Sequence, residues 1–505
     1  MSLVGALLLL VAAGVTSLRW LRVAQREHYL SGSVSRFEGR WLVARPVNLA
    51  LGLITAGLIG TGVAWPVLWI PAAVGLVLFP LGLGLRGHTS KLAWTRRLRT
   101  LAGVTLALAV LVLAVTAAVG IWPVGVALVA LLAPQLVDKA AWILGPIERR
   151  LLDPYVTKAK ARLAQVAPDV VAITGSYGKT TTKQHLKALL DQQFEVCASP
   201  ASYNNTAGLS RTVNEHLHPG TDVLIAEMGM YDVGEIAALC AWIRPRVGVI
   251  TAIGPVHLER LGTIDRVVQA KREILDTAQV AVLNVDDPRL AALADEVAAT
   301  HAVIRCGSSG DGLDVAVRPV GGTRVCIETA GHQVEVDVAE GTHLTNLACA
   351  VGAATAMGLD PGRLAAGVAA IEAPAHRGTV EVTAGGISVI DDTFNSNPVG
   401  ARAGLDALAT LGPDGRRVVV TPGMVELGPR QDPENERFAR EAAEAADTLI
   451  VVKRTNRRAL VRGAAGGGAQ VLTVDDRDQA VAWVRDHLSP GDAVLYENDL
   501  PDHFV

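Results

Sequence analysis

Aromatic residues are scarce in this chain of 505 residues: Phe, Trp and Tyr make up 4% and charged residues 19%, while half of all residues are apolar. So much apolar surface excludes a disordered chain, and the 50 glycines, far below one third of the residues, exclude collagen. The five cysteines all lie beyond residue 196, and the sequence has no CxxC pair. A small disulfide scaffold and a structural zinc site are therefore not expected, and we interpret the cysteines as reduced thiols.

Acidic residues are almost missing from the first 150 residues, which hold 14 Lys or Arg and only 4 Asp or Glu, a net charge of +10. The remainder holds 32 basic and 45 acidic residues, a net charge of −13. The excess arginines lie between apolar runs and not along one polar face, which argues against nucleic acid as a partner. This division instead indicates that the basic, apolar part contacts membrane lipid.

Three runs without any charge dominate this first part, at residues 3–18, 46–85 and 100–137. Forty residues in one helix would be about 60 Å long, twice the thickness of the hydrocarbon layer. The two longer runs must therefore turn, and a Trp-Pro pair near the middle of each supplies the break. The sequence thus predicts about five membrane spans. A buried helical core in a soluble protein is the alternative, but uncharged runs of this length are unusual there.

The basic residues also predict an orientation, because cations concentrate on the cytoplasmic side of membrane proteins. They fall in segments 19–45 and 86–99 and after residue 138, whereas both Trp-Pro turns carry none. We therefore expect a multi-pass protein of the inner (cytoplasmic) membrane, with its N-terminus outside and everything after about residue 138 in the cytoplasm. A cleaved signal peptide is not expected, because no Lys or Arg precedes the first run. No ionisable residue within the runs marks a transport path.

A phosphate-binding loop follows a short β-branched run at residues 170–174. The loop precedes a predicted helix at 182–190, and this strand–turn–helix context is the one in which backbone N–H groups and a helix N-terminus hold phosphate oxygens. A lysine at this place reaches the β and γ oxygens, and a hydroxyl can ligate Mg²⁺. The predicted nucleotide-binding residues of the loop are Gly175, Ser176, Gly178, Lys179, Thr180 and Thr181.

Polar side chains also follow three further apolar runs. Glu227 ends the run at 223–226, His257 follows the run at 247–253, and Asn284 ends the run at 280–283. Ligands bind at the carboxyl edge of a parallel sheet, where such strand ends meet. We expect Glu227 to hold the Mg²⁺ of a nucleotide there and Asn284 to lie in the nucleotide site. Without this context, His257 would be interpreted as an ordinary loop histidine.

The stretch from Val170 to Leu275 resembles the central domain of the Mur ligases, the ATP-dependent amide ligases of cell-wall peptide synthesis, and most resembles their D-alanyl-D-alanine-adding branch. The family's loop TGSxGKTT matches Thr174 to Thr181, and its NNxxG segment contains Asn204 and Asn205 here. The segment around His257 is similar to the family's second metal segment. Lys271 stands where the family carbamylates a lysine.

The resemblance implies a set of roles. ATP and two Mg²⁺ ions are the expected cofactors, the first ion held by Thr180 and Glu227 and the second by His257 and carbamylated Lys271. Lys179, His257 and Lys271 would be the catalytic residues. Without the resemblance, Lys271 would be interpreted as a solvated helix lysine. Asn204 and Asn205 are expected to bind substrate.

The match continues to the end of the chain. Arg377 lies where the family places an arginine at the start of its last domain, and the segment Asp391 to Pro398 is close to the family motif DDxYNANP. Arg377 and Asp391 are expected on the nucleotide, and Asn395 and Asn397 on the substrate. Alternating strands and helices then predict a second doubly wound domain.

Two departures from the family bear on the substrates. The family's N-terminal domain for the UDP-sugar is replaced by the predicted spans, so a lipid-linked or wall-peptide carboxylate donor is considered beside a UDP-linked one. The branch carries a Lys-Gly-Ser-type segment near its end, where this chain has Tyr496-Glu497-Asn498. An acidic residue such as Glu497 would favour a cationic amine as acceptor.

We therefore expect a transmembrane anchor at residues 1–150, followed by a Mur ligase central ATP-binding domain at residues 160–375, which contains the phosphate loop. A C-terminal Rossmann-like domain is expected at residues 376–505. The expected activity is a membrane-bound, ADP-forming ligation of a carboxylate to an amine through an acyl phosphate, in peptidoglycan or other cell-envelope peptide synthesis. Two alternatives remain open: a ligase of the capsule or poly-γ-glutamate type, and a membrane scaffold that binds ATP without catalysis.

Overall fold

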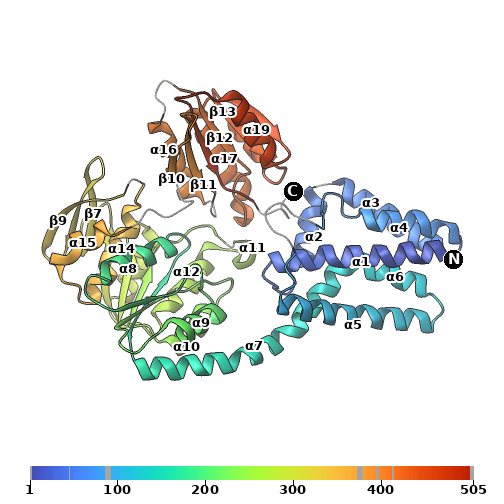
Figure 1. The fold of residues 1–505 in the computed structure, drawn as a ribbon, viewed down its shortest axis with the longest axis horizontal. Coiled ribbons are helices and arrows are strands. Elements are labelled where there is room, and N and C mark those ends of the chain that lie inside the picture. The colour runs from blue at the N-terminus through green and yellow to red at the C-terminus, as the bar shows by residue number, and fades with distance from the viewer. Residues whose placement is uncertain are drawn as a thin grey trace. The chain divides into compact units, whose positions relative to one another are not determined.

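The computed structural model describes residues 3–44, 46–85, 92–256, 258–339, 341–371, 379–393, 397–411 and 415–500. It has two compact units, one formed chiefly by the chain up to Leu151 and the other chiefly by the chain from Leu152 onward. The first unit is helical, and the second holds two sheets covered by helices (Figure 1).

The helical unit breaks where the Trp-Pro pairs predict a turn. Helix α3 ends at Gly62, and a 3-10 turn at Pro66–Leu68 begins the next helix; α5 ends at Ala118, and α6 begins at Trp122. Helix α1 packs against both α4 and α6. The helices are α1 (Leu3–Arg26), α2 (Ser33–Ala44), α3 (Pro46–Gly62), α4 (Trp69–Leu78), α5 (Arg96–Ala118), α6 (Trp122–Leu131) and α7 (Ala133–Val166), which continues into the second unit.

Close helix contacts in this unit depend on small residues. A Cβ at Gly75 would lie 2.4 Å from the Oγ1 of Thr55, and one at Gly125 would lie 1.9 Å from the Oγ1 of Thr116. Glycine at these positions lets α4 approach α3 and α6 approach α5, because it places no side chain between the helices. The outer surface of the unit is apolar as well, with exposed side chains that include Leu7, Leu10 and Val11 on α1, Leu53 and Ile54 on α3, and Leu106, Val110, Leu111 and Val115 on α5.

The number of candidate spans is lower than the sequence predicts. Within the described residues, two helices are long and apolar enough to cross a membrane, those at residues 4–26 and 96–118, or up to four if each of two bent helix pairs is one span. The difference from five arises because the turns cut the long runs unevenly. Helices α4 and α6 have 10 residues each, about 15 Å, which is half of the hydrocarbon thickness.

The first sheet of the second unit has nine strands in the order β2-β3-β1-β4-β5-β6-β7-β8-β9. The strands from β2 to β7 run parallel, whereas β7, β8 and β9 form an antiparallel extension. The sequence runs at 170–174, 223–226, 247–253 and 280–283 all lie in or at strands. The strands are β1 (Asp169–Thr174), β2 (Val196–Ala198), β3 (Val223–Glu227), β4 (Val247–Ile250), β5 (Val280–Asn284), β6 (Ala302–Gly307), β7 (Val315–Gly321), β8 (Arg324–Thr329) and β9 (His332–Asp337).

Helices cover both faces of this sheet (Figure 1), and the two hydrophobic cores separate them. One core includes residues of α8 (Lys179–Leu190), α14 (Leu344–Ala356) and α15 (Leu364–Ala369). The other includes residues of α7, α9 (Thr206–His216), α10 (Glu235–Ile243), α11 (Leu258–Leu261), α12 (Ile264–Arg272) and α13 (Pro288–Val297). The carboxyl ends of β1, β3, β4 and β5 therefore meet at one edge, as ligand binding requires.

The C-terminal sheet has six strands in the order β10-β11-β15-β12-β13-β14, all parallel except for the β10–β11 pair. Helices α16 (Pro398–Thr410), α17 (Gln431–Ala445) and α18 (Arg457–Ala464) pack on one face and α19 (Arg477–His487) on the other. This is a doubly wound domain. Its strands are β10 (Thr379–Val382), β11 (Ser388–Asp392), β12 (Arg417–Thr421), β13 (Thr448–Val452), β14 (Gln470–Val474) and β15 (Ala493–Glu497).

Candidate functional site

The loop after β1 turns sharply on two glycines. Gly175 and Gly178 have φ angles of 157° and 78°, in the region that other residues rarely adopt. A Cβ at Gly175 would lie 1.9 Å from the Oγ1 of Thr251, and one at Gly178 would lie 2.2 Å from the Oδ1 of Asn346. Both positions therefore require glycine. The turn delivers the chain into α8, whose first residue is Lys179, so that the helix N-terminus opens at the loop.

The polar side chains of the loop lie within this turn. Lys179 donates from its Nζ to the carbonyl oxygen of Gly175 at 2.7 Å, which folds its side chain back over the loop. The Oγ of Ser176 accepts from the N–H of Gly254 at 2.9 Å and so joins the loop to the segment after β4. Thr181 is buried at the start of α8.

The carboxylate of Glu227 at this edge contacts three other side chains. Its Oε2 accepts from the Oγ1 of Thr180 at 3.0 Å and from the Nζ of Lys183 at 2.9 Å, and its Oε1 accepts from the Nδ2 of Asn204 at 3.2 Å. The carboxylate is 1% exposed, and the Lys183 side chain is 5% exposed. Side chains from α8, from the segment before α9 and from the end of β3 thus meet at one buried carboxylate. The expected roles of Thr180 and Glu227 toward Mg²⁺ and of Asn204 toward a substrate stay predictions.

Lys183 is the member of this cluster that the sequence analysis does not identify. It lies one helical turn after Lys179, and residues four apart occupy the same helix face. Its ammonium also donates to the carbonyl oxygen of Ala201. Because Lys183 neutralises Glu227 directly, it sets the charge of the cluster and belongs among the candidate functional residues.

Thr180 and Glu227 fit a magnesium ion. Mg²⁺ prefers oxygen ligands and is held in nucleotide sites by one or two carboxylates together with substrate phosphates. The two side-chain oxygens are 3.0 Å apart at the phosphate loop, which is the donor set that such a site uses. The described residues contain no group of three or more His, Cys, Asp or Glu that could hold a metal by themselves. His257, the predicted ligand of the second ion, lies outside the described residues.

Lys271 is buried in α12, with 3% of its surface exposed. Burial lowers the pKa of its amine well below the usual value, and the positive charge of Lys179 lowers it further. The structure therefore brings Lys271 into the electrostatic reach of the phosphate loop, in a state that favours the neutral amine. A neutral amine, unlike an ammonium, has a lone pair that can form a bond.

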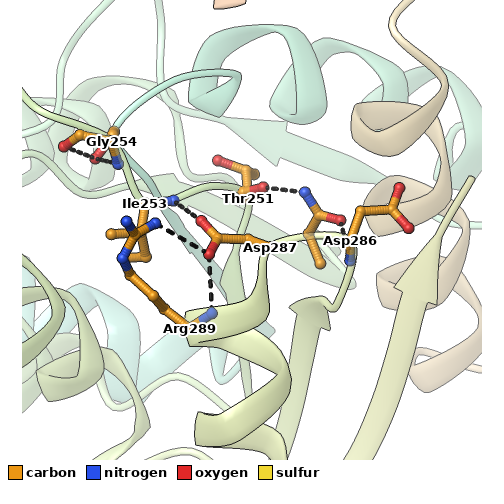
Figure 2. A network of polar contacts seen from close by, with 8 residues as sticks. Thr251, Ile253, Gly254, Asp286, Asp287 and Arg289 are labelled. Carbon is orange, nitrogen blue, oxygen red and sulfur yellow. Dashed lines mark hydrogen bonds and ion pairs between the residues drawn. The ribbon is translucent and has the colours of Figure 1, made fainter. Parts of the chain in front are cut away.

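A network of backbone-directed contacts fixes the ends of β4 and β5 (Figure 2). Asn284 donates to the carbonyl oxygen of Thr251 at 2.9 Å, and Asp287 accepts from the N–H groups of Ile253 and Arg289 at 3.1 and 3.0 Å. Asn284 is 6% exposed and its Oδ1 accepts from the N–H of Asp286. Its side chain thus shapes the rim of the site, and its contact with a nucleotide stays a prediction.

Tyr177 is a second residue that the sequence analysis does not single out. A Cβ at Gly254 would lie 2.1 Å from its phenolic oxygen, so the ring packs directly on that glycine. Burial raises the pKa of the phenol above its usual value, and its oxygen has no hydrogen-bond partner within the described part of the chain. The bulky side chain stands inside a motif whose pattern leaves this position open, which is why the motif gives no signal for it.

Two predicted substrate residues act as helix caps. Asn205 accepts from the N–H of Gly208 at 2.9 Å at the start of α9, and Asn397 accepts from the N–H groups of Val399 and Gly400 at the start of α16. Asparagine is a preferred capping residue, so its occurrence before each helix has a local reason. Roles for Asn205 and Asn397 toward a substrate stay predictions, and Arg377 and Asn395 lie outside the described residues.

At the carboxyl edge of the C-terminal sheet, Asp391 accepts from the Oγ1 of Thr393 at 2.6 Å. Glu497 is fully buried and accepts a hydrogen bond from Thr421. Burial raises the pKa of Glu497 to about 8, with Asp392 adding to the effect. Glu497 is therefore largely protonated at neutral pH and shielded from solvent in this structure.

Comparisons with known proteins agree with this geometry. Residues 173–354 match the Mur ligase middle domain, and residues 376–496 match the Mur ligase glutamate ligase domain. A UDP-N-acetylmuramoyl-tripeptide–D-alanyl-D-alanine ligase of Mycobacterium bovis is 34% identical over 376 residues, which cover 68% of this chain and 73% of the relative. The enzyme of the same name from Mycobacterium leprae is 33% identical, with 67% and 74% covered.

Solved structures give the same result. MurF from Acinetobacter baumannii has a TM-score of 0.60 at 25% identity, with 68% of this chain and 77% of that one covered. MurF ligase from Thermotoga maritima in complex with ADP has a TM-score of 0.59 at 26% identity, with 69% and 80% covered. The matched domains hold the phosphate loop and the Glu227 cluster. This chain belongs to the Mur ligase family and is an ATP-dependent, ADP-forming ligase of that family.

Proposed function

We propose that this protein is a membrane-anchored ligase that joins an amine to a peptide carboxylate in the synthesis of peptidoglycan or a related cell-envelope peptide. The observation that carries the proposal is the buried Glu227 carboxylate, contacted by Thr180 and Lys183 beside the phosphate loop that bears Lys179. The relatives reported above are named for adding D-alanyl-D-alanine to a UDP-linked tripeptide. We propose the same class of reaction here.

In the first step, an oxygen of the donor carboxylate would attack the γ-phosphorus of ATP, an acyl phosphate would form, and ADP would leave. Lys179 and the N–H groups at the start of α8 are placed to neutralise the charge that develops on the phosphate oxygens. Thr180 and Glu227 would hold Mg²⁺, which would neutralise negative charge on the phosphates. Lys183 orients the Glu227 carboxylate through their buried ion pair.

In the second step, the acceptor amine would attack the acyl carbon, the amide bond would form, and phosphate and a proton would leave. Water competes with the amine for the acyl phosphate, so the site must exclude it. At the loop, the Lys183–Glu227 pair is buried and the Tyr177 ring packs on Gly254.

Lys271 has a role in this proposal as a carbamate. Its neutral amine would add to CO₂ to give an N-carboxylate with loss of one proton, which places an anion beside Lys179. The lowered pKa supports this step, because only the neutral amine reacts. The carbamate oxygens would serve the second magnesium ion, together with His257.

The membrane location rests on the helical unit. Its interior is packed and its outer surface carries exposed Leu, Val and Ile side chains on α1, α3 and α5, which soluble proteins rarely expose as a contiguous area. Together with the net charge of +10 between the apolar runs, this supports an anchor that holds the ligase domains in the cytoplasm, with the N-terminus outside.

The test is ADP release by the purified full-length protein. ATP and Mg²⁺ are supplied with candidate peptide carboxylates and amines, and D-alanyl-D-alanine is the first amine to try. The proposal predicts ADP release that requires both substrates and is lost in Lys179→Ala. ADP release that requires neither substrate, or that persists in Lys179→Ala, would refute it.

A further inference from the structure

Three arginines occupy one face of α1 at the end of its apolar run. Arg19, Arg22 and Arg26 are spaced three and four residues apart, so they point to the same side of the helix and span about 10 Å along it. We call them the α1 arginine triad. Arg19, the first arginine of the triad, follows directly after the uncharged run at residues 3–18.

Part of the triad satisfies backbone carbonyls inside the helical unit. The Nη1 of Arg19 donates to the carbonyl oxygens of Val77 at 2.6 Å and Phe79 at 3.2 Å, where α4 ends. The Nη1 of Arg22 donates to the carbonyl oxygen of Gly84 at 2.8 Å. The last carbonyls of a helix lack partners within the helix, so this contact has a structural reason.

Two other donor atoms of the triad, one on Arg19 and one on Arg26, are not used in this way. The Nε of Arg19 and the Nη2 of Arg26 are buried and have no hydrogen-bond partner among the described residues. A buried guanidinium donor without a partner is costly, and Arg remains charged at any relevant pH. Within the triad, Arg19 and Arg26 therefore each carry an N–H group without a partner beside their positive charge.

The four acidic residues in the described part of the chain up to Leu151 do not supply the missing partner, because they contact other groups. No ion pair joins Arg19 or Arg26 to a carboxylate in the described part of the chain. Glu27 lies 3.5 Å from Arg40, and Glu148 lies 2.7 Å from Arg97. Glu38 accepts a hydrogen bond from Gln135 at 2.8 Å, and Asp138 accepts from the N–H groups of Val34 and Ser35.

We propose that the α1 arginine triad binds the phosphate group of a membrane lipid. Arginine N–H groups match phosphate oxygens in geometry and charge, and basic pockets between helices near the cytoplasmic face suit lipid head groups. The lipid chain would lie along the apolar outer surface of α1, which exposes Leu7, Leu10 and Val11. This inference rests on the membrane location in the proposed function, and it gives a lipid-phosphate donor a place to dock.

The test uses the full-length protein in detergent micelles and a long-chain alkyl phosphate as the probe. The double variant Arg19→Gln, Arg26→Gln should bind it at least about tenfold more weakly, because two charge-assisted contacts are lost. A matched control replaces two exposed arginines, Arg36→Gln and Arg99→Gln, and should bind as the wild type does. Arg19→Lys with Arg26→Lys keeps the charge and should retain most of the binding.

Two outcomes would overturn the inference: equal binding by the Gln variant and the wild type, or equal loss in the matched control. Inorganic phosphate at the same concentration should not displace the alkyl phosphate; full displacement would identify a soluble anion as the ligand instead. Lys179→Ala separates this site from the ligase, because it should abolish ADP release and leave alkyl phosphate binding unchanged.

Discussion

The ion pair between Lys183 and Glu227 gives the sharpest quantitative prediction. Replacing Glu227 by Gln leaves the Lys183 ammonium buried without a counter-charge. Replacing Lys183 by Met likewise leaves the Glu227 carboxylate buried without a counter-charge. The double variant Lys183→Met, Glu227→Gln removes both charges. We expect each single variant to lower stability more than the double variant does.

The magnitude follows from the 2.9 Å separation of the charged atoms. At an effective dielectric constant of about 20, two unit charges this close attract by about 6 kcal/mol. Desolvation offsets part of this, and breaking a buried pair from one side typically costs about 3–5 kcal/mol. The double variant should recover at least about 2 kcal/mol relative to the sum of the singles, since both charges have gone.

The assay is thermal unfolding of the four full-length proteins, with and without ADP and Mg²⁺. The unfolding transition whose midpoint temperature rises when ADP is added belongs to the ligase domains. At about 2–4 °C per kcal/mol for a domain of this size, each single variant should lower its midpoint by roughly 6–20 °C. All three variants should lose ADP release, because each removes at least one charged side chain of the cluster at Thr180. This loss is expected in the double variant even though its stability is partly recovered. Additive losses in the double variant would refute the ion pair.

Three further predictions concern buried titratable groups. Lys271→Met should raise the melting temperature near pH 7 in CO₂-free buffer, and the gain should shrink as the pH rises toward 10.5, because the lowered pKa means that folding requires proton loss below that value. Burial lowers the pKa of His185 to about 4, so the unfolding free energy of the wild type, measured relative to that of His185→Leu, should fall by up to about 3 kcal/mol as the pH drops from 6.5 to 4. Because burial raises the pKa of Glu497 to about 8, the unfolding free energy of the wild type, measured relative to that of Glu497→Gln, should decrease by roughly 5 kcal/mol between pH 4.5 and 8. Denaturation followed by circular dichroism across pH checks all three, and parallel pH profiles of variant and wild type would contradict them.

The phosphate loop and the strand ends were predictable because their signals are local. A glycine turn between a β-branched run and a helix specifies its own backbone, and the parallel sheet then brings Thr180 and Glu227 to one edge. Lys183 carried a signal as well, since it lies four residues after Lys179. Its partner was not predictable, because the choice between solvent and the end of β3 depends on how α8 packs against the sheet.

Features that depend on packing were missed. The number of spans depends on where each uncharged run bends, and the residues between Pro66 and Leu85 look equally apolar on either side of a bend. Helix α7 continues through Pro146 and Pro154, which locally argue for an interruption. The capping roles of Asn205 and Asn397 are local, but the family motifs suggested a substrate role for both.

The central claim is that this chain couples ATP cleavage to amide formation at the Glu227 cluster. The most direct measurement is mass spectrometry of the products formed by the full-length protein from ATP, Mg²⁺, a peptide carboxylate and an amine, with oxygen-18 in the carboxylate. The account predicts an amide product in equal amount to ADP, with one oxygen-18 atom transferred to the released phosphate. An amide product with no label in the phosphate, or labelled phosphate without any amide, would contradict it.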